Sequence, residues 1–213
     1  MSDGPKIKIC GITAPAALDA AIEAHADHVG LMFYAPSPRN IAPAQAAALA
    51  ARADGRIGKV GVFVDAADAA IAEAVAAGQL EALQLHGGET PQRAAQLRSA
   101  FGLPVWKVLA VASAADIARA DAYAGAADLI LFDAKTPRGA LPGGMGLVFD
   151  WSLLGAYRGA LPWGLAGGLS VDNVAEAVRV TGASLVDTSS GVESAPGVKD
   201  VDKIAAFCKA ARP

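Results

Sequence analysis

The 213-residue chain has few cysteines, few charged residues and no long uninterrupted hydrophobic segment. Its two cysteines, Cys10 and Cys208, are far apart in the sequence, so neither a disulfide framework nor a metal-binding motif is predicted. No apolar run reaches the roughly 18 residues that a membrane-spanning helix needs. The net charge is −3 and basic residues form no block, which argues against nucleic acid and anionic membranes as partners.

The composition is that of a chain with a large buried core. Hydrophobic residues make up 54% and charged residues 18%, so most of the surface of each element must be covered by other elements. The length suggests one large domain or two small ones, and we expect a single domain spanning residues 1–213. Residues 1–5 have no basic and apolar tract, so we expect no signal peptide and a cytoplasmic location. No spacing of His, Cys and carboxylate residues matches a metal site, and we expect no cofactor.

The chain alternates strand and helix patterns eight times. The predicted strands are 6–12, 28–34, 59–64, 80–86, 104–111, 128–133, 163–166 and 184–187. The helices that follow are expected at 16–26, 43–53, 66–77, 90–100, 113–122, from about 150, at 171–181 and at 201–211. We expect Thr13 to cap the first helix and Gly78 to end the third. Eight strand–helix units predict an α/β fold, a single (β/α)8 TIM barrel. A doubly wound open sheet is the alternative, but no dinucleotide fingerprint is present.

Alternation along the strands places several reactive side chains together. In the first strand Lys8 and Cys10 share the face opposite two isoleucines, and a neighbouring ammonium group favours the thiolate. The same reading turns His86, Asp133 and Asp187 toward the mouth of the barrel, where the active sites of this fold lie. Each residue taken alone also has a purely structural interpretation, Cys10 as a small buried hydrophobic residue and the others as capping, core or turn residues.

A second signal predicts a phosphate site. The loops after strands seven and eight usually bind phosphate in this fold, and glycines there let backbone amides approach the anion. The residues concerned are Gly167, Gly168, Ser189, Ser190 and Gly191. Ordinary tight turns are the alternative interpretation. Arg39, in the loop after strand two, offers a planar donor pair suited to a carboxylate, although a lone arginine is also a common surface charge.

Seven motifs in the same order resemble those of the phosphoribosylanthranilate isomerase family of tryptophan biosynthesis. They are Lys8-Ile9-Cys10-Gly11-Ile12-Thr13, Ser37-Pro38-Arg39, Val60-Gly61-Val62-Phe63, Gln84-Leu85-His86-Gly87, Phe149-Asp150-Trp151, Ala166-Gly167-Gly168-Leu169 and Asp187-Thr188-Ser189-Ser190-Gly191-Val192-Glu193. The resemblance extends from residue 8 to about residue 204. The first and last motifs are the specific ones, since a Gly-Gly pair alone is common.

The resemblance implies an Amadori rearrangement of a phosphosugar, with Cys10 as the base and Asp133 as the acid. We expect Lys8 to stabilise the Cys10 thiolate, and partial burial to keep a proton on Asp133. Arg39 would hold the carboxylate of the anthranilate. The residues expected to bind the substrate are Lys8, Arg39, His86 and Asp187. The expected partner is a small phosphosugar, and the chain is expected to be a monomer or a homodimer.

One loop departs from the family pattern. The family usually has a small polar residue in the Gly-Gly-x-Gly segment after strand six, whereas this chain has Met145, whose thioether is a poor hydrogen-bonding group. We expect the backbone amides of this loop, at Gly144 and Gly146, to contribute to phosphate binding and Met145 to cover the substrate. Lys135 and Arg138 in the same loop have no assigned role.

Two other functions are compatible with the barrel. Lys107 on strand five could form a Schiff base, as in an aldolase or lyase, if burial activates its amine. A phosphosugar-binding barrel without catalytic activity is the second alternative, and it predicts binding that is indifferent to thiol alkylation.

Overall fold

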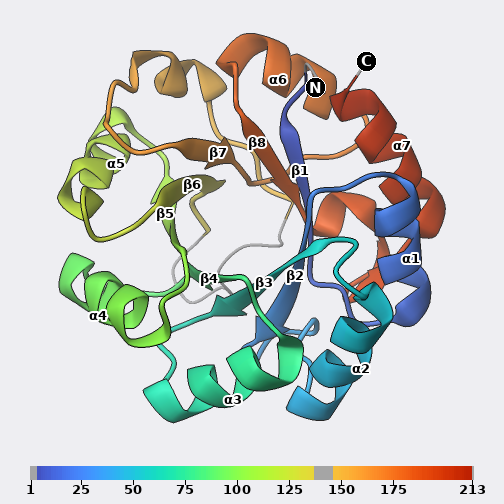
Figure 1. The fold of residues 1–213 in the computed structure, drawn as a ribbon. Coiled ribbons are helices and arrows are strands. Elements are labelled where there is room, and N and C mark those ends of the chain that lie inside the picture. Colours follow the sequence, from blue (N-terminus) through green and yellow to red (C-terminus); the bar gives the residue numbers. More distant parts are fainter. Residues whose placement is uncertain (1–3, 137–145, 213) are drawn as a thin grey trace.

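The computed structural model describes residues 4–136 and 146–212, and its strands close into a parallel barrel surrounded by helices (Figure 1). The strands of the barrel are β1 (Lys6–Cys10), β2 (His28–Phe33), β3 (Gly58–Phe63), β4 (Ala82–Leu85), β5 (Val105–Val111), β6 (Leu129–Ala134), β7 (Trp163–Leu165) and β8 (Leu185–Thr188). Each strand pairs with its neighbour in sequence, and β8 pairs with β1 to close the ring. The predicted (β/α)8 barrel is confirmed and the open sheet is wrong.

The outer layer consists of helices that follow the strands. The α-helices are α1 (Pro15–Glu23), α2 (Pro43–Ala53), α3 (Asp68–Gly78), α4 (Pro91–Phe101), α5 (Ala114–Ala118), α6 (Val174–Thr181) and α7 (Val201–Ala211). Three short 3-10 helices are η1 (Arg119–Tyr123), η2 (Trp151–Ala156) and η3 (Ser190–Val192). After β8 a small antiparallel hairpin, which the sequence does not predict, is made by β9 (Glu193–Ala195) and β10 (Val198–Lys199).

Two details of the predicted helices are wrong. The segment beginning near Asp150 forms the 3-10 helix η2 and not an α-helix, and Gly155 within it is a poor α-helix former. Thr13 does not cap α1; its hydroxyl instead donates to the Gly197 carbonyl at 3.4 Å. Gly78 is the last residue of α3, as predicted, and Gln79 after it takes the left-handed conformation.

The two faces of the strands have different surroundings. The outward side chains pack against the helices in one large core, which includes Ile7, Ile9, Leu83, Leu85, Ile130 and Phe132. The inward side chains form a separate apolar cluster that fills the interior, made of Val60, Ala82, Trp106, Val108, Leu131 and Leu185. Because apolar side chains close the interior, polar inward residues can reach a ligand only near the carboxyl ends of the strands.

Candidate active site

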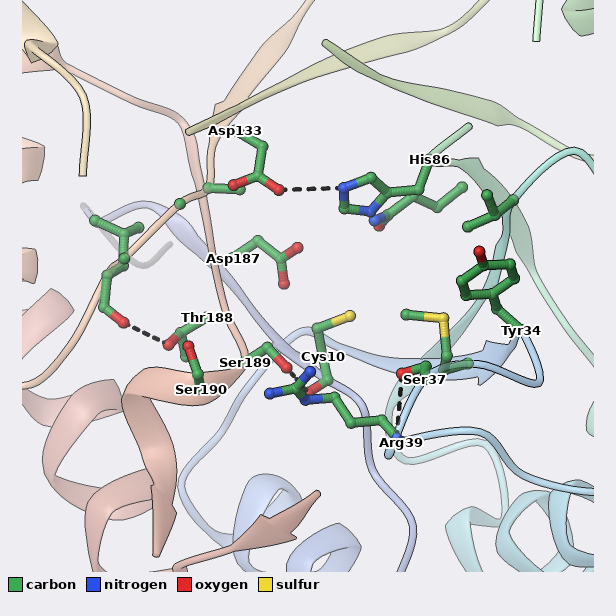
Figure 2. A pocket seen from close by; sticks show the side chains of 17 residues that line it. Cys10, Tyr34, Ser37, Arg39, His86, Asp133, Asp187, Thr188, Ser189 and Ser190 are labelled. Atoms are coloured by element: carbon green, nitrogen blue, oxygen red, sulfur yellow. Dashed lines mark hydrogen bonds and ion pairs between the residues drawn. The ribbon is translucent and has the colours of Figure 1, made fainter. Parts of the chain in front are cut away.

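A cavity opens at the carboxyl ends of the barrel strands (Figure 2). Nine of the residues predicted for the site line it, namely Cys10, Arg39, His86, Asp133, Gly167, Gly168, Asp187, Ser189 and Ser190. Lys8 lies beneath the cavity, and Gly146 and Gly191 do not line it. Gly144, Met145 and Arg138 are outside the described residues. The barrel therefore brings together side chains that are up to 180 residues apart in the sequence.

Cys10 is the last residue of β1, and its side chain faces the cavity (Figure 2). Gly30 of the neighbouring strand leaves room for it, since a Cβ atom at Gly30 would lie 2.7 Å from the Cys10 sulfur and 3.1 Å from the Lys8 ammonium. Burial raises the pKa of the Cys10 thiol, and this outweighs the opposite effect of Lys8. Lys8 therefore favours the thiolate, in the direction that the sequence predicts, while burial sets the net direction of the shift.

Lys8 and Asp187 form a buried ion pair beneath the thiol. The Lys8 ammonium donates to both carboxylate oxygens of Asp187, at 2.9 and 3.0 Å, and no part of Lys8 is exposed. Burial lowers the pKa of Lys8, but the charges of Asp187 and Cys10 together raise it by a larger amount. The pKa of Lys8 therefore lies above the ordinary value. Lys8 is thus a cation held below the cavity, and it lowers the pKa of the thiol above it.

Asp133, the next-to-last residue of β6, lies on the opposite side of the cavity and faces His86 from the loop after β4 (Figure 2). One Asp133 oxygen is 3.2 Å from Nε2 of His86, and the other accepts the Ala134 amide at 2.8 Å. Gly167 closes over this carboxyl group with a φ of +85°, and a Cβ atom there would lie 2.8 Å from Oδ1 of Asp133. His86 and Gly167 together hold the carboxyl group of Asp133 in one orientation.

A cluster of three charged side chains borders the cavity near Cys10. Glu193 accepts from Arg39 through both carboxylate oxygens, at 2.7 and 2.8 Å, and from the Lys199 ammonium at 2.6 Å. Lys199 also donates to the carbonyl and hydroxyl oxygens of Ser189, whose hydroxyl in turn donates to the Cys10 carbonyl at 3.1 Å. Two cations share one carboxylate, so the cluster carries one net positive charge.

Burial has opposite effects on the members of this cluster. It raises the pKa of Glu193, but Arg39 and Lys199 lower it by more, so the pKa lies below the ordinary value. It lowers the pKa of Lys199, and Glu193 only partly offsets this effect. Glu193 belongs to a predicted motif without a predicted role, and Lys199 is not among the residues that the sequence predicts for the site. The unpredicted β9–β10 hairpin is what carries both residues to the site.

The loops after β7 and β8 form the third side of the cavity. Gly167 and Gly168 both have positive φ angles, and the Thr188 hydroxyl donates to the Leu169 carbonyl at 2.6 Å, which joins the two loops. A Cβ atom at Gly191 would lie only 1.9 Å from the Leu169 carbonyl oxygen. Gly191 therefore supports the loop junction from behind, where only a glycine fits.

Lys107 does not line this cavity. It lies on the outward face of β5, 2% exposed, and its ammonium donates to Glu89 at 2.9 Å and to the carbonyls of Leu85 and Gly87. The Schiff-base alternative is wrong, because this amine is turned away from the site and engaged in an ion pair. Lys135 lies 3.6 Å from Asp116 on the surface.

The side chains of the site limit which ligands it can bind. Within residues 4–136 and 146–212, no group of three or more His, Cys, Asp or Glu side chains could hold a metal ion. A thiol and a carboxyl group instead face one cavity, beside a cationic cluster and a glycine- and serine-rich edge. The fold and the site together are those of a (β/α)8-barrel enzyme whose active site lies at the carboxyl ends of the strands.

Comparison with known proteins identifies the family. Residues 7–210 match the model of the family described as N-(5'phosphoribosyl)anthranilate (PRA) isomerase, and the chain belongs to this family. The isomerase of Paramagnetospirillum magneticum is 57% identical over 208 residues, covering 97% of both chains. That of Rhodopseudomonas palustris strain BisB18 is 54% identical over 207 residues, covering 97% of this chain and 95% of the relative. The chain is an isomerase of tryptophan biosynthesis, as the resemblance implies.

Solved structures agree with this assignment. The phosphoribosyl anthranilate isomerase of Thermotoga maritima superposes with a TM-score of 0.86 at 38% identity, covering 97% of this chain and 98% of that one. A second isomerase structure, in complex with reduced 1-(o-carboxyphenylamino)-1-deoxyribulose 5-phosphate, has a TM-score of 0.84 at 36% identity, with coverage of 97% and 98%.

Proposed function

We propose that Cys10 is the general base and Asp133 the general acid in the rearrangement of N-(5-phosphoribosyl)anthranilate to 1-(2-carboxyphenylamino)-1-deoxyribulose 5-phosphate. The reaction needs one group to protonate the ring oxygen, so that the aminal opens to an iminium ion, and another to remove a proton from the adjacent carbon. The observation that carries the proposal is that these two side chains, from β1 and β6, line one cavity. Each such group contributes about 10² to 10⁴ in rate.

The environment of Cys10 makes a basic thiolate that is scarce at neutral pH. Burial raises the pKa of the thiol, while Lys8 and Lys199 lower it without reversing the shift. A thiolate formed against this burial is a strong base, and a bound substrate that carries positive charge at nitrogen would favour it further. The kcat/KM of the wild type should therefore rise with pH through pH 8 and 9, because kcat/KM reports the ionisation of the free enzyme.

The two ends of the substrate would lie against different parts of the cavity. The cluster of Arg39, Lys199 and Glu193, with its net positive charge, suits the anthranilate carboxylate. The loops that carry Gly167, Gly168, Ser189 and Ser190 suit the phosphate, because they offer hydroxyl groups and close backbone approach. The isomerase solved with a reduced product analogue supports a ligand of this class, with a carboxylate at one end and a phosphate at the other.

The test follows the loss of phosphoribosyl anthranilate by fluorescence in a coupled assay. We expect Cys10→Ala and Asp133→Asn each to lower kcat by about 10² to 10⁴ with little change in KM. Arg39→Ala should mainly raise KM. Cys208→Ala is the matched control, because this second thiol is buried on α7 outside the cavity, and it should leave kcat unchanged. Normal turnover by Cys10→Ala would show that another group is the base.

The oligomeric state and location are further parts of the proposal. We expect a monomer or a homodimer, and one solved relative is titled as monomers generated from a dimeric isomerase of Thermotoga maritima. Light scattering across a range of concentrations distinguishes the two states. A cytoplasmic location is expected for an enzyme of amino-acid biosynthesis. Across the described ranges 4–136 and 146–212, no helix is long and apolar enough to cross a membrane.

A further inference from the structure

Gln84 has a buried polar atom that the protein leaves unsatisfied. It lies on the inner face of β4, two residues before His86, and it lines the cavity although it is only 1% exposed. Among the residues that the structure describes, its amide oxygen Oε1 has no hydrogen-bond partner. Buried side-chain oxygens are rarely left in this state, because removal from water without a new donor is unfavourable.

The surroundings of Gln84 explain why no donor within residues 4–136 and 146–212 reaches this oxygen. Its neighbours in register are Val62 on β3, which is apolar and fully buried, and Trp106 on β5. Two side chains with N–H groups near this position face carboxylates elsewhere, Lys8 at Asp187 and His86 at Asp133. An amide at this position is therefore unfavourable for the protein alone, and an apolar side chain would pack without that cost.

We propose that Gln84 is a substrate-contacting residue whose amide oxygen accepts a hydrogen bond from a donor of the bound phosphosugar. This inference rests on the proposed function. The substrate has two kinds of donor, the ribose hydroxyls and the N–H that links the sugar to the aromatic ring. That nitrogen becomes positively charged when the sugar ring opens, so an acceptor beside it would contribute most in the transition state.

The test is Gln84→Met, which keeps the length of the side chain and removes the amide, with Gln84→Leu as a second variant. Gln96→Met, on the exposed face of α4, is the matched control and should behave as the wild type. We expect kcat/KM of Gln84→Met to fall at least tenfold, while the melting temperature without ligand stays the same or rises. A contact to the charged N–H lowers kcat, whereas a contact to a hydroxyl raises KM.

Two results would overturn the proposal. A kcat/KM within about twofold of the wild type in both variants would show that the amide touches no substrate donor. A melting temperature that falls in both variants together with activity would show that Gln84 supports the barrel and not the substrate. Cys10→Ala, measured in the same assay, separates this inference from the assignment of the base, because its turnover tests the base alone.

Discussion

The charged cluster of Glu193, Arg39 and Lys199 makes a quantitative prediction for Glu193→Gln. The Glu193 carboxylate accepts three hydrogen bonds, two from Arg39 and one from Lys199. The side chains are 5% exposed for Glu193, 9% for Arg39 and 1% for Lys199, so water cannot replace the lost charge. Glutamine keeps the shape and one acceptor oxygen, but it leaves two buried cations beside each other without a counter-charge.

The expected size of the effect follows from this burial. Removal of one partner of a buried ion pair costs about 3–5 kcal/mol. In a domain of this length each kcal/mol lowers the melting temperature by about 2–4 °C, so a decrease of about 6–20 °C is expected. Scanning calorimetry or thermal denaturation followed by circular dichroism measures it. The KM should also rise, because Arg39 loses the carboxylate that holds its guanidinium in place.

The pH dependence of the melting temperature tests the role of the Glu193 charge independently. Because the folded-state pKa of Glu193 lies below its ordinary value, its stabilisation is present above the unfolded pKa, about 4.3, and is lost as pH falls through the folded pKa. The difference in melting temperature between wild type and Glu193→Gln should therefore be largest near pH 7. It should become smaller as the pH falls below about 4.

The matched control is Glu176→Gln on α6. Glu176 also forms a two-point contact with an arginine, Arg179, but the two side chains are 54% and 72% exposed. Water and salt screen such a surface pair, so the control should lower the melting temperature far less than Glu193→Gln does. If Glu193→Gln were no less stable than Glu176→Gln, the account of a buried, mutually dependent cluster would be refuted.

Three further predictions concern other parts of the barrel. Lys107→Met should lower stability by about 3–5 kcal/mol in a denaturant titration, because it leaves a buried carboxylate unpaired, and borohydride should trap no adduct in the wild type. Gly191→Ala should raise KM and lower the melting temperature, since its Cβ atom would lie 1.9 Å from the Leu169 carbonyl oxygen. Alkylation of the native protein by iodoacetamide should be slow at pH 8 and accelerate up to pH 9 and beyond. Burial raises the pKa of Cys208 to about 11, so about one part in a thousand of this thiol is thiolate at pH 8. Cys10 lines the cavity and should react first. Bound product should protect Cys10 from alkylation.

The barrel and the positions of Cys10 and Asp133 at one cavity could be predicted because both depend on local patterns. Alternation along β1 turns Lys8 and Cys10 inward while Ile7 and Ile9 pack against helices, and the structure has this arrangement. The end of β6 places Asp133 at the mouth by the same rule of two-residue periodicity. These assignments need only the strand positions and the knowledge that parallel strands end at one edge of a barrel.

These local patterns do not predict the pKa values or the ion pairs of the site. From the first strand alone, Lys8 predicts a lowered thiol pKa, but burial depends on the whole barrel and reverses the direction. Arg39 was expected to offer a charge to the substrate, yet it already shares the carboxylate of Glu193, 154 residues away. Whether an ionisable group is paired and how far it is desolvated are properties of the packed molecule.

The order of apolar and polar residues along the chain by itself determined the closed barrel, because period-two strands and intervening helices bury their faces in only a few ways. The tertiary structure alone decided which charges meet, which donors are already used, and which buried polar atoms, the Gln84 oxygen among them, have no partner among the described residues. The physical reason is range: strand and helix patterns act between near neighbours, whereas desolvation and ion pairing join residues that only closure of the ring brings together.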